Sequence, residues 1–123
     1  MTGRFQNLDK LRLPARPANA LQELEKILDA LVQHYGAEKI IAFGSCVRGV
    51  PTEHSDVDLC VIRQHPPGCT HPGLEADLAV CRTRPLLSTD LLVRDPSELA
   101  RSRARPFGVM DEVLNHGVIL YER

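Results

Sequence analysis

The most informative part of the sequence is Phe-Gly-Ser-Cys-Val-Arg-Gly at residues 43–49, followed by Ser-Asp-Val-Asp-Leu at residues 55–59. The first stretch ends the apolar run 39–43, which predicts a short buried strand leading into a Gly-Ser turn. In the second stretch, carboxylates alternate with apolar residues, which predicts a strand over 56–62 with one buried face. Two strands joined through a short helical segment at 46–49 therefore form the expected centre of the fold.

Helical and strand patterns alternate around this centre. Apolar residues at spacings of three and four predict an amphipathic helix over 17–35, which Gly36 would end in a left-handed conformation. Asp-Pro-Ser-Glu at residues 95–98 combines an N-cap residue, a proline at the first helical position and a glutamate three residues after the cap, so it predicts a helix start. This interleaving indicates the α/β class. The other expected elements are a helix over 74–81, strands over 86–93 and 118–121, and a helix or broken pair of helices from 96 toward 115.

Length and composition indicate one ordinary globular domain. The chain has 123 residues, 43% hydrophobic and 25% charged, and it contains no internal repeat. We expect residues 1–16, which show no clear period, to form a loosely held N-terminal arm, and residues 17–123 to form the domain. The proline-rich segment 64–73 should be a loop.

Charge and hydropathy exclude several classes of protein. The formal net charge is −1 and tryptophan is absent, which argues against a dedicated nucleic-acid surface. No apolar run approaches the ~18 residues that cross a membrane, and the N-terminus lacks a signal-peptide pattern, so we expect a cytoplasmic protein. In that compartment the four cysteines should be free thiols. The loop around His65, Cys69 and His71 has poor spacing for zinc, so we interpret it as a polar loop.

The carboxylates of the second stretch are candidates for a metal site. Asp56 and Asp58 should project from the same side of their strand, while Val57 and Leu59 project from the other. Two like charges in a largely apolar strand are costly unless a cation lies between them. Mg²⁺ is the cation that this hard oxygen pair suits, because it commonly binds one or two carboxylates together with substrate phosphates.

Asp90 is a further unusual acid, because it interrupts the apolar run 86–93. If this strand lies beside the strand of Asp56 and Asp58, three carboxylates converge on one patch. Such a patch could hold two Mg²⁺ ions for in-line phosphoryl transfer.

Gly44 and Ser45 would supply the other half of this site. A strand that ends in Gly-Ser before a short helix exposes backbone N–H groups that suit a phosphate, and glycine lets the phosphate approach closely. Ser45 could equally be the N-cap of that helix. Arg48, one turn later, could contact a phosphate or could brace a neighbouring acid.

Together, residues 43–49 and 55–59 resemble the signature of the DNA polymerase β-type nucleotidyltransferase superfamily. The resemblance extends over roughly residues 40–121, and the short chain is similar to the minimal nucleotidyltransferases, or MNT proteins. It implies a small mixed β-sheet backed by helices. It also implies an enzyme that uses Mg²⁺ and a nucleoside triphosphate, with ATP as the donor.

The resemblance implies a role for each matching residue. Asp56 and Asp58 match the two metal-binding acids, and Asp90 matches a third carboxylate that helps to deprotonate the acceptor hydroxyl. Gly44 and Ser45 match the residues that hold the triphosphate. Minimal members often pair with a helical HEPN protein, and some act as antitoxins that attach AMP to it, so a HEPN-type protein is the partner that the resemblance implies.

Several alternatives remain open on the sequence alone. The chain could be a non-catalytic antitoxin or binding module, or it could modify a small molecule as aminoglycoside nucleotidyltransferases do. A partner, or a second copy of the chain in a homo-oligomer, would then supply the acceptor surface. Arg101, Arg103 and Arg105 form either a solvated face or a docking surface, and Arg82 and Arg84 could contact phosphate.

Overall fold

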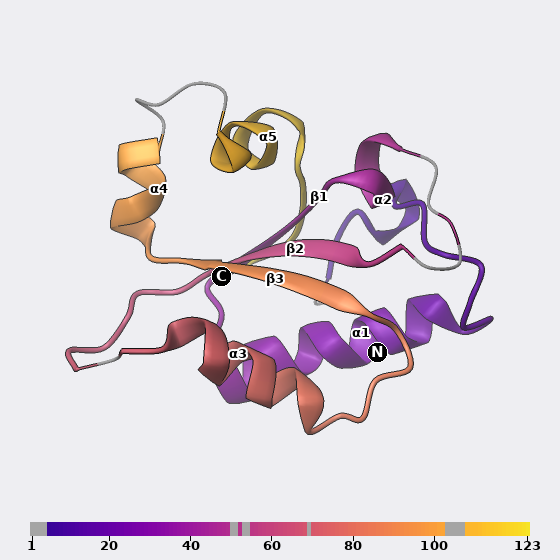
Figure 1. The fold of residues 1–123 in the computed structure, drawn as a ribbon, viewed down its shortest axis with the longest axis horizontal. Helices are drawn as coiled ribbons and strands as arrows, with labels where there is room; N and C mark the ends of the chain where they lie inside the picture. The colour runs from indigo at the N-terminus through magenta and orange to yellow at the C-terminus, as the bar shows by residue number, and fades with distance from the viewer. Residues whose placement is uncertain (1–4, 50–51, 53–54, 69, 103–107) are drawn as a thin grey trace.

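A computed structural model of the protein describes residues 5–49, 52, 55–68, 70–102 and 108–123. These residues form a sheet of four strands in the order β3-β2-β1-β4, with helices on both of its faces (Figure 1). The strands are β1 (Lys39–Phe43), β2 (Val57–Ile62), β3 (Thr89–Arg94) and β4 (Val118–Glu122). The helices are α1 (Ala20–Ala30), α2 (Ser45–Arg48), α3 (Pro72–Cys81), α4 (Pro96–Ser102) and α5 (Val109–His116).

The sheet is mixed, as the resemblance of residues 43–49 and 55–59 implied. β1 pairs antiparallel with both β2 and β4, whereas β2 and β3 run parallel. The parallel pair requires a crossover, and α3 supplies it by packing against one face of the sheet between the two strands. A register shift between Ile40 and Ile41 marks a bulge in the pairing with β4.

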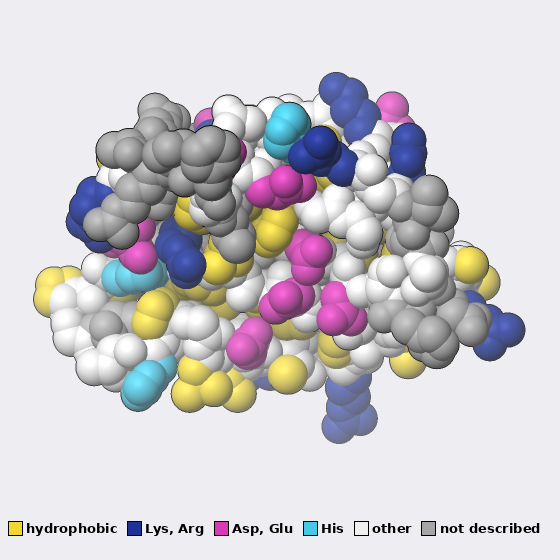
Figure 2. Space-filling view, turned by 45° about the horizontal axis from the view of Figure 1, so that its top comes forward, with side chains coloured by type: hydrophobic (Ala, Val, Ile, Leu, Met, Phe, Trp, Pro, Cys, Tyr) yellow, Lys and Arg dark blue, Asp and Glu magenta, His cyan; other side chains and the backbone are white. Residues whose placement is uncertain are grey.

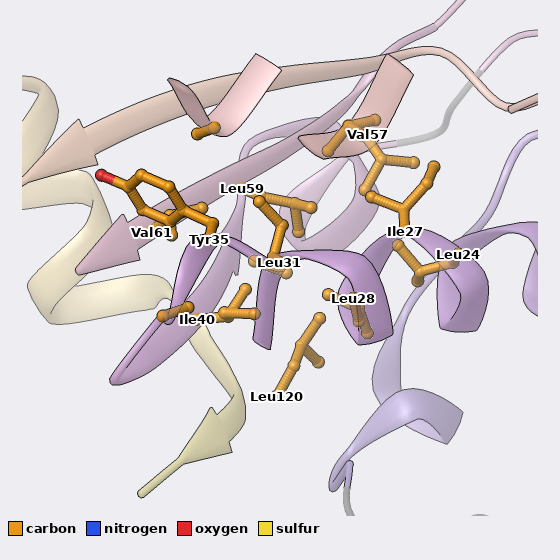
Figure 3. Close-up of a cluster of buried hydrophobic side chains, with 14 of the residues drawn as sticks. Leu24, Ile27, Leu28, Leu31, Tyr35, Ile40, Val57, Leu59, Val61 and Leu120 are labelled. Atoms are coloured by element: carbon orange, nitrogen blue, oxygen red, sulfur yellow. The ribbon is translucent and has the colours of Figure 1, made fainter. Parts of the chain in front are cut away.

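The larger hydrophobic core lies between the sheet and the layer formed by α1 and α3. Figure 3 shows side chains of α1 meeting those of β1, β2 and β4 in this core. Val57, Leu59 and Val61 project into it from β2, because alternate residues of a strand share one face. The apolar stripe of α1 covers them with side chains that are fully buried. This face of β2 is therefore closed to solvent, and its opposite face must carry any accessible site.

A smaller cluster covers the opposite face of the sheet. Cys60 and Ile62 of β2 pack there with Ile41 of β1, beneath Met110 and Val113 of α5. Asp58 and Asp90 share this face by alternation, but they lie at the end where β2 and β3 begin. The acids therefore adjoin a covered apolar surface without being enclosed by it.

The helix predicted over 17–35 ends before Gly36 as expected, but its last turn is a π-helix and not an α-helix. The α-helical part stops at Ala30, and residues Leu31–Tyr35 continue as a turn of π-helix labelled η2. Gly36 follows with a φ of 88°, in the left-handed region, and its N–H donates to the carbonyl of Leu31. The prediction that Gly36 ends this helix in a left-handed conformation is confirmed.

The helix start predicted at 95–98 is also confirmed. The Asp95 carboxylate accepts a hydrogen bond from the N–H of Ser97 at 2.8 Å, and the N–H of Asp95 donates to the Glu98 carboxylate at 3.0 Å. The predicted broken pair of helices corresponds to α4 and α5. The expected strand over 86–93 begins later, at Thr89, because residues 86 and 87 form a bend and Leu86 faces solvent.

Residues 5–16, which were expected to be loosely held, contact the body of the domain at several points. The N–H of Gln6 donates to Leu120 at 2.8 Å, and the ring of Phe5 meets that of Tyr121 edge-on. The N–H of Arg12 donates to the carbonyl of Cys46 at 2.7 Å. The segment, which includes the short helix η1 (Leu8–Lys10), thus links the edge strand β4 to α2.

Within the described residues, no helix is both long and apolar enough to cross a membrane.

Candidate active site

Asp58 and Asp90 lie side by side on neighbouring strands. They are register partners in the parallel pair of β2 and β3, on the face opposite the larger core. Asp58 is partly buried, whereas Asp90 is exposed as the second residue of β3. Because β3 begins at Thr89, Asp90 stands near a strand start and not in an apolar interior as the sequence suggested. Its charge is therefore less costly there than expected.

Asp56 completes the acidic group predicted from the sequence. It immediately precedes β2 and is exposed, and the N–H of the following Val57 donates to the carbonyl of Ser88 at 3.0 Å. That bond extends the pairing of β2 and β3 by one residue, to the end of the sheet at which the acids lie. Acidic side chains gather in the middle of this face of the molecule (Figure 2).

The electrostatics of Asp58 reflect this crowding. Burial raises the pKa of its carboxyl above the usual range, and the negative charges of Asp90 and then Asp56 raise it further. Ionisation of Asp58 is therefore less favourable in the folded protein than for a fully solvated carboxyl, and a bound cation would relieve the repulsion.

Gly44 connects the end of β1 to this acid. Its φ of 77° and ψ of −147° belong to a region that is essentially confined to glycine. A Cβ at this position would overlap the Oδ2 atom of Asp58. Glycine is therefore required twice at residue 44, for the backbone conformation and for the space that the Asp58 carboxylate occupies.

The short helix α2 starts directly after this turn. Gly44 is its N-cap residue, so Ser45 is the first helical residue and not the cap. The carbonyl of Gly44 accepts from the N–H groups of Val47 and Arg48, both at 3.0 Å. α2 therefore follows the glycine turn that lies against Asp58.

Arg48 braces an acid on another helix. Its Nη1 atom lies 3.3 Å from Oε2 of Glu112 on α5, and the side chain of Arg48 is 53% exposed. Of the two roles considered for Arg48, the ion pair is the one that the structure records. Sequence reasoning could not find Glu112, because only the packing of α5 over the sheet brings the two residues together.

The sequence analysis did not predict the role of the buried cysteines next to the acids, Cys46 and Cys60. The thiol of Cys46 donates to the carbonyl of Phe43 at 3.3 Å, and the main-chain N–H of Asp58 hydrogen-bonds to its sulfur. Burial raises the pKa of the Cys46 thiol, and it raises the pKa of Cys60 to about 11. Both cysteines are free, as is Cys81, which confirms the thiol prediction for the described cysteines; Cys69 lies outside them. Cys46 therefore acts as a neutral packing residue that joins α2 to β2.

Glu23 of α1 holds the segment that leads into β3. It is buried, and its carboxylate accepts the N–H of Leu86 at 2.7 Å and pairs with Lys26. The bond from Leu86 and then that from Lys26 lower the pKa of Glu23. The sequence carried a signal, because Glu23 lies three residues after Ala20 and four before Ile27, on the apolar face of its helix.

The donor set fits Mg²⁺ by its chemistry. Asp56, Asp58 and Asp90 offer hard carboxylate oxygens. Burial first, and then the charges of Asp90 and Asp56, raise the pKa of Asp58. Among the described residues, however, no three His, Cys, Asp or Glu side chains are arranged to hold one metal ion. Mg²⁺ usually takes only one or two protein carboxylates, with phosphate and water completing its shell, so a site made by two of these acids stays a prediction.

The other predicted candidates lie apart from the acids. Arg82 lines a hollow with His34 and Arg63 at the far side of α3, and Arg84 is exposed beyond that helix. Arg101 is exposed at the end of α4, whereas Arg103 and Arg105 lie outside the described residues. The loop around His65 and His71 shows no metal-binding group in the part that the structure describes.

A comparison with models of protein families gives a match. The family model described as a nucleotidyltransferase domain matches residues 24–101, which is more than half of the 123 residues. The matched segment runs from α1 to α4 and contains the glycine turn and the acids of β2 and β3. A search of curated proteins gave no match.

Proposed function

Because this chain belongs to the nucleotidyltransferase domain family of the polymerase β-like superfamily, we propose that it transfers a nucleoside monophosphate from a nucleoside triphosphate to a hydroxyl acceptor. The observation that supports this most is the position of Asp58. It lies against Gly44 and beside Asp90, where burial and the neighbouring acids raise the pKa of its carboxyl and a bound cation would favour its charged form.

In the proposed reaction, the acceptor oxygen forms a bond to the α-phosphorus of the triphosphate. The bond between that phosphorus and the α,β-bridging oxygen breaks, and pyrophosphate leaves. The hydroxyl proton passes to the carboxylate of Asp90, which is exposed and so accessible to an acceptor from outside the domain. Attack in line with the leaving group requires accurate positioning more than covalent catalysis.

Asp56 and Asp58 would hold Mg²⁺, shared with the triphosphate. When bound, Mg²⁺ supplies charge neutralisation for the phosphates and for the attacking oxygen. Gly44 and Ser45 would hold the phosphates close to the acids. Arg48 would add a positive charge near the phosphates while its pairing with Glu112 limits its freedom.

For the donor we propose ATP, and for the acceptor a hydroxyl group of a partner protein. A HEPN-type helical protein, modified as in an antitoxin–toxin pair, is the first partner to test. The exposed positions of Asp56 and Asp90 favour a large acceptor, because neither acid is covered by another described element.

The test uses the full chain with α-labelled ATP, Mg²⁺ and either a cell lysate or a co-expressed HEPN-type protein. We expect label to enter an acceptor, and Asp58→Asn to lower the rate by at least ~100-fold, the usual cost of losing electrostatic stabilisation. Asp77→Asn is the matched control, because Asp77 is an exposed acid on α3, in the layer on the other side of the sheet.

The outcomes separate the rival functions. A rate unchanged by Asp58→Asn would contradict the proposed mechanism. Binding of a protein partner without any labelling would favour the non-catalytic binding module. Labelling of a small molecule would favour the aminoglycoside-like function.

A further inference from the structure

Helix α3 exposes its large apolar side chains to solvent, which is unusual for a surface helix of a monomeric domain. Ala76, Ala79 and Val80 are buried against the sheet and the neighbouring helices. On the opposite side, Leu74 is 56% exposed and Leu78 is 52% exposed. A surface helix normally shows a polar outer face, whereas a helix that is apolar all round is normally covered on all sides.

The exposed leucines form a continuous stripe. Leu74, Leu78 and Cys81 follow each other at spacings of four and three, which places them on one face of the helix. Leu78 stands between two hollows of about 310 Å³ and 260 Å³, and it lines both. The stripe therefore offers both a ridge and the depressions that could receive a ridge from another helix.

Charges beside the stripe indicate what covers it. Glu75 and Arg82 are seven residues apart, so they lie on the same flank of the stripe, two turns from each other. In an antiparallel helix pair, the equivalent flanks of the two helices face each other. A second copy of α3, related by a two-fold axis near Leu78, would place Arg82 of each copy opposite Glu75 of the other.

We propose that this face of α3 is a homodimer interface, in which two copies of the helix pack antiparallel about Leu78. The surface is self-complementary in both shape and charge, which is the requirement of an interface between identical partners. A different partner, without an acidic and a basic residue at equivalent positions, would be complementary only to the exposed leucines of α3.

The dimer would leave the acidic site open. α3 packs on the face of the sheet that carries the larger core, opposite α4 and α5 (Figure 1). Asp58 and Asp90 lie on the other face by strand alternation. The inference therefore does not depend on the proposed transfer reaction, and its test can fail independently.

The expected dimer is weak. One helix of ten residues forms an interface smaller than the ~800 Å² per partner of a standard complex. We therefore expect a dissociation constant on the order of 1–100 µM. Sedimentation equilibrium of the full chain over a concentration range around these values measures it directly.

Two kinds of variant test the interface. Leu78→Asp should leave a monomer at every concentration, whereas Leu21→Asp should not, because Leu21 is an exposed leucine at the start of α1, outside the stripe. Circular dichroism and melting of both variants confirm that they remain folded.

Charge reversal gives a sharper result that does not depend on the core of the interface. Glu75→Arg and Arg82→Glu should each weaken the homodimer at least ~10-fold, since each creates two like-charged contacts. The double reversal should restore it, and mixing the two single variants should produce a mixed dimer. A wild-type chain that is monomeric up to about 500 µM would overturn the proposal. So would a dimer that survives Leu78→Asp, or single reversals that leave the dissociation constant unchanged.

Discussion

The carboxylate of Asp58 occupies the space in which any other residue at position 44 would place its Cβ atom. Gly44 ends the turn after β1, and Asp58 belongs to β2, which pairs antiparallel with β1. The glycine conformation and the acid therefore form one structural unit, in which the glycine turn and the acid-bearing strand are in direct contact. A substitution at either residue should therefore displace the other.

Gly44→Ala should lower both stability and transfer. The backbone conformation at residue 44 and the overlap with Asp58 should together cost about 3 kcal/mol in the free energy of unfolding. Gly68→Ala is the matched control, because Gly68 also has a positive φ, of 84°, but nothing lies within 4 Å of its added Cβ. That variant should lose only about 1–2 kcal/mol. Urea unfolding of the two variants measures the difference, and equal losses would show that the contact with Asp58 is unimportant.

Mg²⁺ and triphosphate should stabilise the protein together more than either does alone. A ligand at about a hundred times its dissociation constant adds ~2.7 kcal/mol, which corresponds to roughly 8 to 13 °C in melting temperature for a domain of this size. The triphosphate alone should add little, since its charge faces the acids that already raise the pKa of Asp58. Asp56→Asn and Asp90→Asn should reduce the joint shift in a melting assay. Equal stabilisation by ATP in EDTA would contradict the metal site.

Arg48→Ala should weaken triphosphate binding about 10-fold, the order expected for one charge-assisted hydrogen bond. Its effect on the free energy of unfolding should stay below about 1 kcal/mol, because the ion pair with Glu112 is largely exposed. Glu112→Gln removes the same ion pair but keeps Arg48, so it should leave the affinity unchanged or raise it. Titration calorimetry distinguishes the two variants, and an equal loss of affinity in both would assign Arg48 a purely structural role.

The stability of the protein should decrease at low pH through Asp95. Hydrogen bonds from the N–H of His65 and from the N–H and hydroxyl of Ser97 lower its pKa from 3.8 to about 2. Because the folded pKa lies below the unfolded one, the stabilisation is complete above about pH 4 and is lost as the pH falls toward 2. Asp95→Asn should lack this part of the pH dependence. Unfolding of both proteins between pH 5 and pH 2 tests the assignment, which parallel curves would contradict.

Much of the local structure follows from short-range patterns. The strand 39–43, the end of the first helix at Gly36 and the cap at Asp95 each depend on residues within a few positions of one another. The start of β3 was predicted too early, since its pattern includes Leu86, which is apolar but exposed. An exposed leucine and a buried leucine are identical in the sequence, so a periodic apolar pattern cannot distinguish a surface position from a core position.

Local patterns in the chain were enough to indicate a glycine turn and alternating acids within one α/β domain, because turn conformation and strand alternation depend on neighbouring residues. Three-dimensional packing established that Asp90 is the register partner of Asp58, since parallel pairing depends on how α3 crosses between the strands. It also decided that Glu112 reaches Arg48 from 64 residues away and that the leucines of α3 face outward. These relationships arise from packing between distant segments, whose free energy is shared among many contacts and is encoded in no single stretch of the chain.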